Sequence, residues 1–239
     1  MHCHILPAVD DGAGSIEEME KMLKIAYDEG IRCIIATPHH HPWRGKEHPD
    51  VLRERLKTVR EAAHRIDSQF RVYLGTEIYF GQDIPEKLRA GRVLSMNRRK
   101  IILVEFSPSA KYTYIQQGIQ QLQMSGYEVI LAHAERYTCL VENITFVEHL
   151  REMGVRIQIN AGSINGDSGR KIKKFVKELM DNDLVFGVGT DAHDDSRRAP
   201  KMKKAADYVK KRYGEDYMRR VFFSNAKTML RKRVKNESK

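Results

Sequence analysis

Residues 129–136 read Val-Ile-Leu-Ala-His-Ala-Glu-Arg, a short apolar run that stops at a histidine. The four apolar residues have the length and composition of a strand that is buried on both faces. Residues 115–124, which precede it, repeat apolar side chains at helical spacing, and this pattern stops at Gly126. The stretch therefore predicts a helix followed by a strand, with a metal-type side chain where the strand ends.

The same unit recurs along the chain. A capping box at Ser15 predicts a helix start, and further helices are expected at 51–66, 146–153, 170–180, 201–212 and 217–222. Apolar runs alternating with such helices are typical of a parallel sheet. Counting the first residues, we expect seven strands, at 2–4, 33–36, 72–74, 101–104, 129–132, 155–160 and 184–189. Seven βα units fit an α/β barrel better than a small open sheet.

No linker, repeat or low-complexity segment divides the 239 residues, so we expect one domain over residues 1–239. The basic segment 231–239 lacks an apolar period and is expected to be a mobile tail. No apolar run approaches the roughly 18 residues of a membrane span, and no signal peptide leads the chain, which predicts a cytoplasmic protein. The formal net charge of +10 predicts attraction to anionic partners.

Metal-type side chains stand where the predicted strands end or just beyond. Because all strands of a parallel barrel end at one rim, where active sites lie, these side chains are expected to converge. For an isolated His-x-His pair, two surface histidines at a frayed terminus would be an equal alternative. A random rim would carry Lys, Ser and Asn as often, so the full set favours a metal centre. Its members are His2, His4, Asp11, His39, Glu77, Glu105, His133, Asp191 and His193.

Nine ligands exceed the three or four of one tetrahedral zinc, and predict two or three ions that share a bridging carboxylate. Imidazole and carboxylate ligands suit Mn, Fe, Zn or Ni. Bound metal lowers the pKa of coordinated water to about 7. The positive charge of the ions that their carboxylate ligands leave uncompensated would hold an anionic substrate. We therefore expect hydrolysis of a phosphate ester by a metal-bridging hydroxide. Arg136 and Arg198, on the same rim, are predicted to bind the phosphate oxygens.

Taken as a set, the motifs of this chain resemble the PHP (polymerase and histidinol phosphatase) superfamily. The combination is most similar to the bacterial metal-dependent tyrosine phosphatases of capsule and exopolysaccharide loci, from His2 to about Leu230. The motifs are His-x-His from His2, Asp-Asp-Gly from Asp10, Ala-Thr-Pro-His ending at His39, Gly-x-Glu-Ile around Glu77, Glu-Phe at Glu105, Ala-His-x-Glu-Arg-Tyr from Ala132 and Asp-Ala-His from Asp191.

The resemblance implies a distorted (β/α)7 barrel that usually holds Mn2+, with Fe, Zn, Co or Mg as alternatives. It implies a protein-tyrosine phosphatase that acts on the phosphotyrosine tail of a bacterial tyrosine autokinase and regulates polysaccharide production. Arg136 and Arg198 match the phosphate-binding arginines. The implied metal sites are His2, His4, Glu77 and Asp191 for one ion, Glu77, Glu105 and His133 for a second, and Asp11, His39 and His193 for a third.

One departure concerns the start of the chain. The family has three or four residues before its first motif histidine, whereas here Met1 directly precedes His2. We therefore expect either a start that lies upstream or a shortened first strand, which would loosen His2 and His4.

Other activities are excluded or remain as alternatives. A cysteine-dependent tyrosine phosphatase needs C-x5-R, and Val9, His39 and Thr145 stand six residues after the three cysteines. A histidinol-phosphate or other small-molecule phosphoesterase would use the same metal centre, and a closed rather than open rim would favour it. A non-enzymatic alternative is a basic protein that binds nucleic acid or a membrane surface.

The lysine-rich stretches 171–174 and 201–204 are typical of solvated helix faces. We expect them to steer an acidic or phosphorylated partner, with peripheral membrane association but no insertion and no specific nucleic acid.

Overall fold

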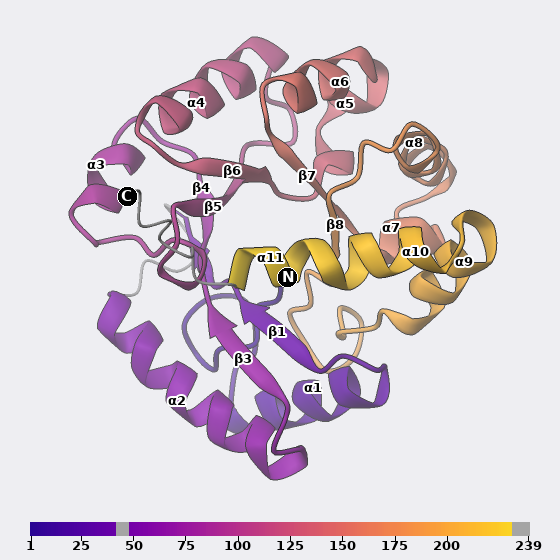
Figure 1. Ribbon diagram of the computed structural model, residues 1–239. Helices are drawn as coiled ribbons and strands as arrows, with labels where there is room; N and C mark the ends of the chain where they lie inside the picture. Colours follow the sequence, from indigo (N-terminus) through magenta and orange to yellow (C-terminus); the bar gives the residue numbers. More distant parts are fainter. Residues whose placement is uncertain (42–47, 231–239) are drawn as a thin grey trace, which may run out of the picture.

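Strands lie at the centre of the molecule and helices surround them (Figure 1). The computed structural model describes residues 1–41 and 48–230, so the expected tail at 231–239 lies outside the described residues. Within these ranges the paired strands are all parallel, in one sheet of order β1-β3 and one of order β2-β4-β5-β6-β7-β8. The predicted α/β class with a parallel sheet is confirmed. The strands are β1 (Cys33–Ala36), β2 (His39–His40), β3 (Arg71–Leu74), β4 (Glu77–Tyr79), β5 (Ile101–Glu105), β6 (Glu128–Leu131), β7 (Arg156–Asn160) and β8 (Gly187–Gly189).

The predicted helices are present with small changes at their ends. At the first helix, the hydroxyl of Ser15 accepts from the backbone N–H of Glu18 at 3.2 Å, and the Glu18 carboxylate accepts from the backbone N–H of Gly14 at 2.7 Å. The capping box is therefore confirmed, with its return bond one residue earlier than in the usual form. These helices are α1 (Ile16–Asp28), α2 (Pro49–Ile66), α4 (Tyr112–Met124), α6 (Thr145–Glu152), α8 (Arg170–Asp181), α9 (Lys203–Tyr213) and α10 (Glu215–Arg219).

Several short helices were not predicted. Each has three to six residues, which is too short to carry an apolar period that sequence reading can detect. The unpredicted segments are α3 (Ile84–Arg89), η1 (Met96–Arg98), η2 (Ala134–Arg136), α5 (Thr138–Glu142), α7 (Ala161–Asn165) and α11 (Asn225–Leu230). The π-helical η3 (Arg220–Ser224) continues α10 and overlaps the helix predicted at 217–222.

The second and third predicted strands continue beyond a bend. Pro38, between β1 and β2, has no backbone N–H and so interrupts the ladder. The N–H of Gly75 donates to the carbonyl of Ala36 at 2.8 Å, and that of Glu77 donates to the carbonyl of Pro38 at 3.0 Å, so both strands bend together. Glu77 consequently begins β4, whereas the sequence predicts a strand at 72–74 with Glu77 just beyond its end.

The first residues lie between the end of β8 and the end of β1. Cys3 forms a parallel bridge with Ala192, and the N–H of His4 donates to the carbonyl of Ala192 at 2.8 Å. On the other side, the N–H of Thr37 donates to the carbonyl of Cys3 at 2.9 Å, and the Thr37 hydroxyl accepts from the N–H of Cys3 at 3.0 Å. The predicted first strand is thus reduced to a bridge, but its backbone is held on both sides.

The interior of the sheet changes character along its strands. In β5 the side chains of Ile101 and Leu103 point inward and pack with Met229 of α11, while Ile102 and Val104 pack against the helices. Figure 1 shows α11 crossing beside the N-terminus, and its Met229 is fully buried. Alternation along β5 makes Glu105 the next inward residue, at the carboxyl end of the strand. The interior beside the amino ends of the strands is therefore mainly apolar, and the interior beside their carboxyl ends is polar.

Candidate metal centre

The nine predicted ligands converge at the carboxyl ends of the strands. Three groups have ligand atoms that all lie within 4.8 Å of one another. His133 lies against the middle group, with Nε2 2.8 Å from Oε1 of Glu77 and 3.6 Å from Oε2 of Glu105. The groups are His2, His4, Glu77 and Asp191; His39, Glu77 and Glu105; and His4, Asp11, His39 and His193.

The first group coincides with the first site that the resemblance implies, and the other two differ from the implied sets in one respect each. The structure brings His39, in addition to His133, to the Glu77–Glu105 pair, because Nδ1 of His39 lies 3.2 Å from an oxygen of each carboxylate. It also brings His4 to the third group. Neighbouring sites are thus close enough to share side chains.

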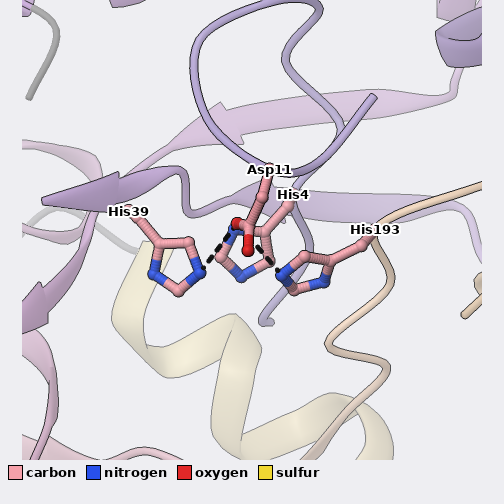
Figure 2. Close-up of side chains that lie close together, drawn as sticks. All are labelled: His4, Asp11, His39 and His193. Carbon is pink, nitrogen blue, oxygen red and sulfur yellow. Dashed lines mark ion pairs between the residues drawn. The ribbon is translucent and has the colours of Figure 1, made fainter. Parts of the chain in front are cut away.

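Figure 2 shows the third group, in which His4 and Asp11 come from the residues before α1, His39 from β2 and His193 from the chain after β8. The Asp11 carboxylate lies between two imidazoles, with Oδ1 3.2 Å from Nε2 of His39 and 3.6 Å from Nε2 of His193. The ring of His4 lies behind them, with its centroid 3.9 Å from that of His193. The imidazoles are buried, whereas the Asp11 side chain is 42% exposed, so Asp11 marks the open side of the centre.

Hydrogen bonds orient three of the imidazoles. Nδ1 of His4 contacts the Asp10 carboxylate at 2.9 Å, and Nδ1 of His2 contacts the side-chain oxygen of Gln158 at 3.0 Å. Nδ1 of His193 contacts the backbone carbonyl of Asp191 at 2.9 Å. Because each of these partners accepts, each Nδ1 carries a proton, so the neutral form of each imidazole has its lone pair on Nε2, where a metal would bind. His4 therefore has one nitrogen available, which serves the first or the third group but not both.

Glu77 is the central carboxylate of the cluster and is fully buried. Its Oε2 lies 3.1 Å from Nε2 of both His2 and His4, and its Oε1 faces His133. Burial alone would raise the pKa of Glu77, but these imidazoles outweigh it and hold the pKa well below its usual value. A carboxylate with imidazoles on both oxygens has the arrangement of a bridging ligand.

Several buried atoms of the cluster make no hydrogen bond among the described residues, although some lie 3.1 to 3.2 Å from a ring nitrogen or carboxylate oxygen of the same cluster. They are both ring nitrogens of His39, Oε2 of Glu77, Oε1 of Glu105 and Nδ1 of His133. Buried polar atoms are rarely left unsatisfied, and a bound cation would satisfy lone pairs of this kind. The orphaned atoms and the all-imidazole and carboxylate donor set therefore fit divalent metal ions.

The two predicted phosphate-binding arginines lie at the edge of the cluster. Nη2 of Arg136, from η2, donates to Oδ2 of Asp191 at 2.5 Å, and Nη2 of Arg198 donates to the same oxygen at 3.0 Å. The other oxygen of Asp191 faces His2 at 3.3 Å and His4 at 3.4 Å. The arginine side chains are 43% and 39% exposed, so they border the ligands from the solvent side.

Residues that we did not predict surround the ligands. Gln158 also accepts from the backbone N–H of His133 at 2.9 Å, and the Asn160 amide donates to Asp191 at 3.1 Å. Both lie on the inward row of β7, and two polar residues alternating in a buried strand were a signal that could have found them. Asp10 adjoins the predicted ligand Asp11, but its carboxylate contacts Nδ1 of His4, a supporting role that we did not predict.

Glu135 is also buried next to the site, and burial raises the pKa of its carboxyl group. It accepts from the backbone N–H of Asn160 and from the hydroxyl of Ser163, both at 2.8 Å. These bonds attach the chain after β7 to η2, the segment that carries Arg136.

Parts of the backbone at the site adopt conformations or close approaches that residues with a Cβ atom rarely tolerate. His133 and Asp191 have φ values of 32° and 51°, in the left-handed region that non-glycine residues rarely occupy. Gly12 turns against the ligand segment so closely that a Cβ there would lie 2.2 Å from the carbonyl oxygen of His4. These strained and close positions lie where the chain leaves the sheet to present its ligands.

Known proteins match this chain over nearly its whole length. Tyrosine-protein phosphatase YwqE of Bacillus subtilis (strain 168) is 35% identical over 231 residues, which cover 97% of this chain and 91% of YwqE. Tyrosine-protein phosphatase CpsB of Streptococcus pneumoniae is 31% identical over 235 residues, which cover 96% of this chain and 97% of CpsB.

A solved structure agrees with these matches. It comes from a study of YwqE and CpsB described as unique metal-dependent tyrosine phosphatases, and it superimposes with a TM-score of 0.88 at 34% identity. The superposition covers 96% of this chain and 92% of the other. The family described as "Capsular polysaccharide synthesis, CpsB/CapC" matches residues 1–231. The chain therefore belongs to the CpsB/CapC family of capsular polysaccharide synthesis.

Proposed function

We propose that this chain is a metal-dependent protein-tyrosine phosphatase that acts in the control of capsular or exopolysaccharide production. The observation that carries the proposal is the convergence of nine ligand side chains beside two arginines. Its relatives named tyrosine-protein phosphatases, and the metal-dependent phosphatase structure that it matches, support the same activity.

We further propose a distorted (β/α)7 barrel of the PHP type, formed as one domain over residues 1–239. Treating β1 with β2, and β3 with β4, as two bent strands gives seven strand positions when the bridge at Cys3 is included. The bonds of the Cys3 segment to both neighbours support closure of the ring.

Two or three ions, with Mn2+ as the preferred metal, would occupy the centre. His2, His4, Glu77 and Asp191 would hold the first, because the Nε2 of His4 faces Glu77 and Asp191. Glu77, Glu105 and His133 would hold the second, and Asp11, His39 and His193 the third. When bound, such ions act as Lewis acids toward phosphate oxygens and lower the pKa of coordinated water to about 7.

The chain's own groups would bind and orient the phosphate. Arg136 and Arg198 present N–H donors at the solvent edge of the cluster, where they can hold phosphate oxygens and stabilise charge in the transition state. Asp10 and Gln158 keep two ligand imidazoles in the tautomer that exposes Nε2. The phenol of tyrosine has a pKa of about 10, so its departure needs less protonation than an alkyl alcohol would.

The solvent-exposed edge of the ligand cluster favours a phosphotyrosine on a polypeptide over histidinol phosphate as the substrate. Both arginines and Asp11 are about two-fifths exposed, so a phosphotyrosine projecting from a chain can reach them. We propose the phosphotyrosine tail of a bacterial tyrosine autokinase as the substrate, in the cytoplasm.

The helices that the structure describes include no candidate membrane span, since none combines the required length with sufficient apolar character.

Hydrolysis of a phosphotyrosine peptide by protein purified without chelator tests the activity. We expect release of phosphate that stops after metal chelation and returns with Mn2+, and much slower turnover of histidinol phosphate. Faster hydrolysis of histidinol phosphate, or turnover that is indifferent to chelation, would contradict the proposal.

A further inference from the structure

A cavity of about 640 Å³ opens beside the two arginines. Arg136, Asp191 and Arg198 form its end next to the metal centre, and the chain after β7 and the start of α9 form its walls. The cavity is therefore continuous with the place proposed for the phosphate, and its volume lies within the range of ligand sites in proteins, roughly 300–1,000 Å³.

Among the charged side chains of the lining, cations outnumber carboxylates by five to three. Two of the three carboxylates are already engaged, because Asp191 faces the ligand imidazoles and Glu29 accepts from the backbone N–H groups of Met202 and Lys203 at 2.9 and 2.7 Å. Asp167 is the third. The cationic side chains are Arg136, Arg197, Arg198, Lys201 and Lys204.

Three of these cations, Arg197, Lys201 and Lys204, have no side-chain hydrogen bond or ion pair in the part of the chain that the structure describes. Some cations elsewhere on the surface, such as Lys87 and Arg220, pair with an acid, whereas others, such as Lys171, also lack a pair among the described residues, so it is the concave position that distinguishes these three. An unpaired cationic group that borders a concave site attracts anions more strongly than one on a convex surface, because the surrounding protein focuses the field.

Resting on the proposed function, we propose that this cavity binds a second anionic group of the substrate polypeptide, next to the phosphotyrosine that is hydrolysed. The group would be a carboxylate or another phosphotyrosine a few residues away. Side chains two positions apart on an extended peptide point to one side and lie about 7 Å apart. Because the cavity shares Arg136 and Arg198 with the phosphate position, one chain can place both anions.

The test compares three peptides of equal length, each with one hydrolysable phosphotyrosine. The flanking positions carry glutamine in the first and glutamate in the second, and a phosphonate analogue of phosphotyrosine, which is not hydrolysed, in the third. At low ionic strength we expect kcat/KM for a peptide with an anionic flanking group to exceed that for the glutamine peptide by about tenfold, equivalent to about 1.4 kcal/mol. A gain for the third peptide alone would identify a phosphate as the preferred group, and a gain for both would show that a carboxylate suffices.

The chain offers a matched pair of variants. Lys201→Glu/Lys204→Glu reverses two charges on the cavity, and Lys171→Glu/Lys174→Glu reverses two exposed lysines of the same spacing on α8, outside it. In the first variant we expect the ratio of kcat/KM for an anionic peptide to that for the glutamine peptide to fall to about one. In the second variant this ratio should stay unchanged. Arg197→Ala should reduce the preference in part.

The outcomes separate this inference from the proposed function. Hydrolysis of all three peptides at equal rates by the unaltered protein would overturn the inference and leave the phosphatase activity intact. Equal loss of preference in both double variants would overturn it as well, since attraction by the net charge would then suffice. No hydrolysis of any peptide would overturn the proposed function, and the inference with it.

Discussion

The two ends of the interior that the parallel strands enclose have contrasting chemistry, although the same strands supply both. At the amino end, Ile101 and Leu103 of β5 pack with Met229 of α11 in an apolar cluster. At the carboxyl end, the next inward residue of the same strand is Glu105, a member of the proposed metal centre. A single strand thus changes from packing to ligand binding within a few residues.

This contrast separates stability from function. The apolar end mainly buries hydrocarbon side chains, and Nη1 of Arg156 is the unsatisfied buried atom at that end of β7. The polar end contains several such atoms, and two of its ligand candidates, His133 and Asp191, have positive φ values. Such features reduce stability and persist where a bound ligand uses them. Substitutions at the two ends should therefore separate loss of activity from loss of folding, in the following order of expected effect.

Replacing Glu77 by glutamine should have the largest effect. Glu77 contacts imidazoles through both oxygens, so the change removes the charge that two ions would share. We expect the metal content to fall and kcat/KM to drop by at least about 10³-fold, because bound metal supplies several kcal/mol of transition-state stabilisation. Elemental analysis and a phosphotyrosine peptide assay measure both quantities. Glu128→Gln, at the amino end of β6, is the control, and normal metal content in the Glu77 variant would refute its bridging role.

Replacing Arg136 by alanine should lower kcat by about 10²- to 10³-fold, the range found when one transition-state donor is removed. Metal content should stay unchanged, because Arg198 still pairs with Asp191. Arg151→Ala on the exposed face of α6 is the control. Loss of metal from the Arg136 variant would instead assign this arginine a structural role.

Replacing Met229 by alanine tests the apolar end. Its side chain is fully buried beneath the strands, so we expect the free energy of unfolding to fall by about 3 kcal/mol. The kcat of the folded variant at 25 °C should not change. Urea denaturation measures the first quantity, and Met124→Ala, at a residue 89% exposed, should cost less than about 0.5 kcal/mol. A large fall in kcat without a fall in stability would contradict the separation of the two ends.

Replacing Gln158 by alanine tests the support around the ligands. Gln158 holds Nδ1 of His2 and the backbone N–H of His133, so its loss should weaken metal affinity by about 10- to 100-fold. Competition with a metal indicator measures the affinity, with Gln69→Ala in an exposed turn as the control. Unchanged affinity would mean that packing alone orients the two histidines.

The smallest expected effect is the release of protons from ligand histidines when metal binds. Burial alone would lower the pKa of His39 and His133, but the neighbouring carboxylates outweigh it and raise both pKa values to about 9 without metal. Burial and nearby His4 lower the pKa of His193 to about 3, so His193 is neutral at pH 7. The two raised pKa values stabilise the metal-free protein below pH 6.5, and this contribution is lost as the pH rises through about 9.

Metal needs neutral imidazoles, so binding at pH 7 should release up to about two protons from this pair, and metal affinity should rise with pH toward 9. Calorimetric titration in buffers of different ionisation enthalpy measures the release. Equal heats in all buffers would contradict it.

Much of this arrangement could be predicted from sequence, because apolar runs that stop at a ligand type determine both the strand and its polar end. His133 after β6 and Asp191 after β8 are examples. The bends at Pro38 and Gly75 could not be predicted, since both residues are also common in ordinary loops. Gln158 and Asp10 were missed because they act through a neighbouring histidine rather than on a metal, and only three-dimensional contact reveals that role.

Anomalous diffraction from crystals of the active protein, recorded at the absorption edge of its native metal, tests the central claim most directly. We expect two or three peaks at the carboxyl ends of the strands, with Glu77 between two of them and Arg136 and Arg198 beside the cluster. Peaks elsewhere in an active crystal, or none, would contradict the proposed metal centre.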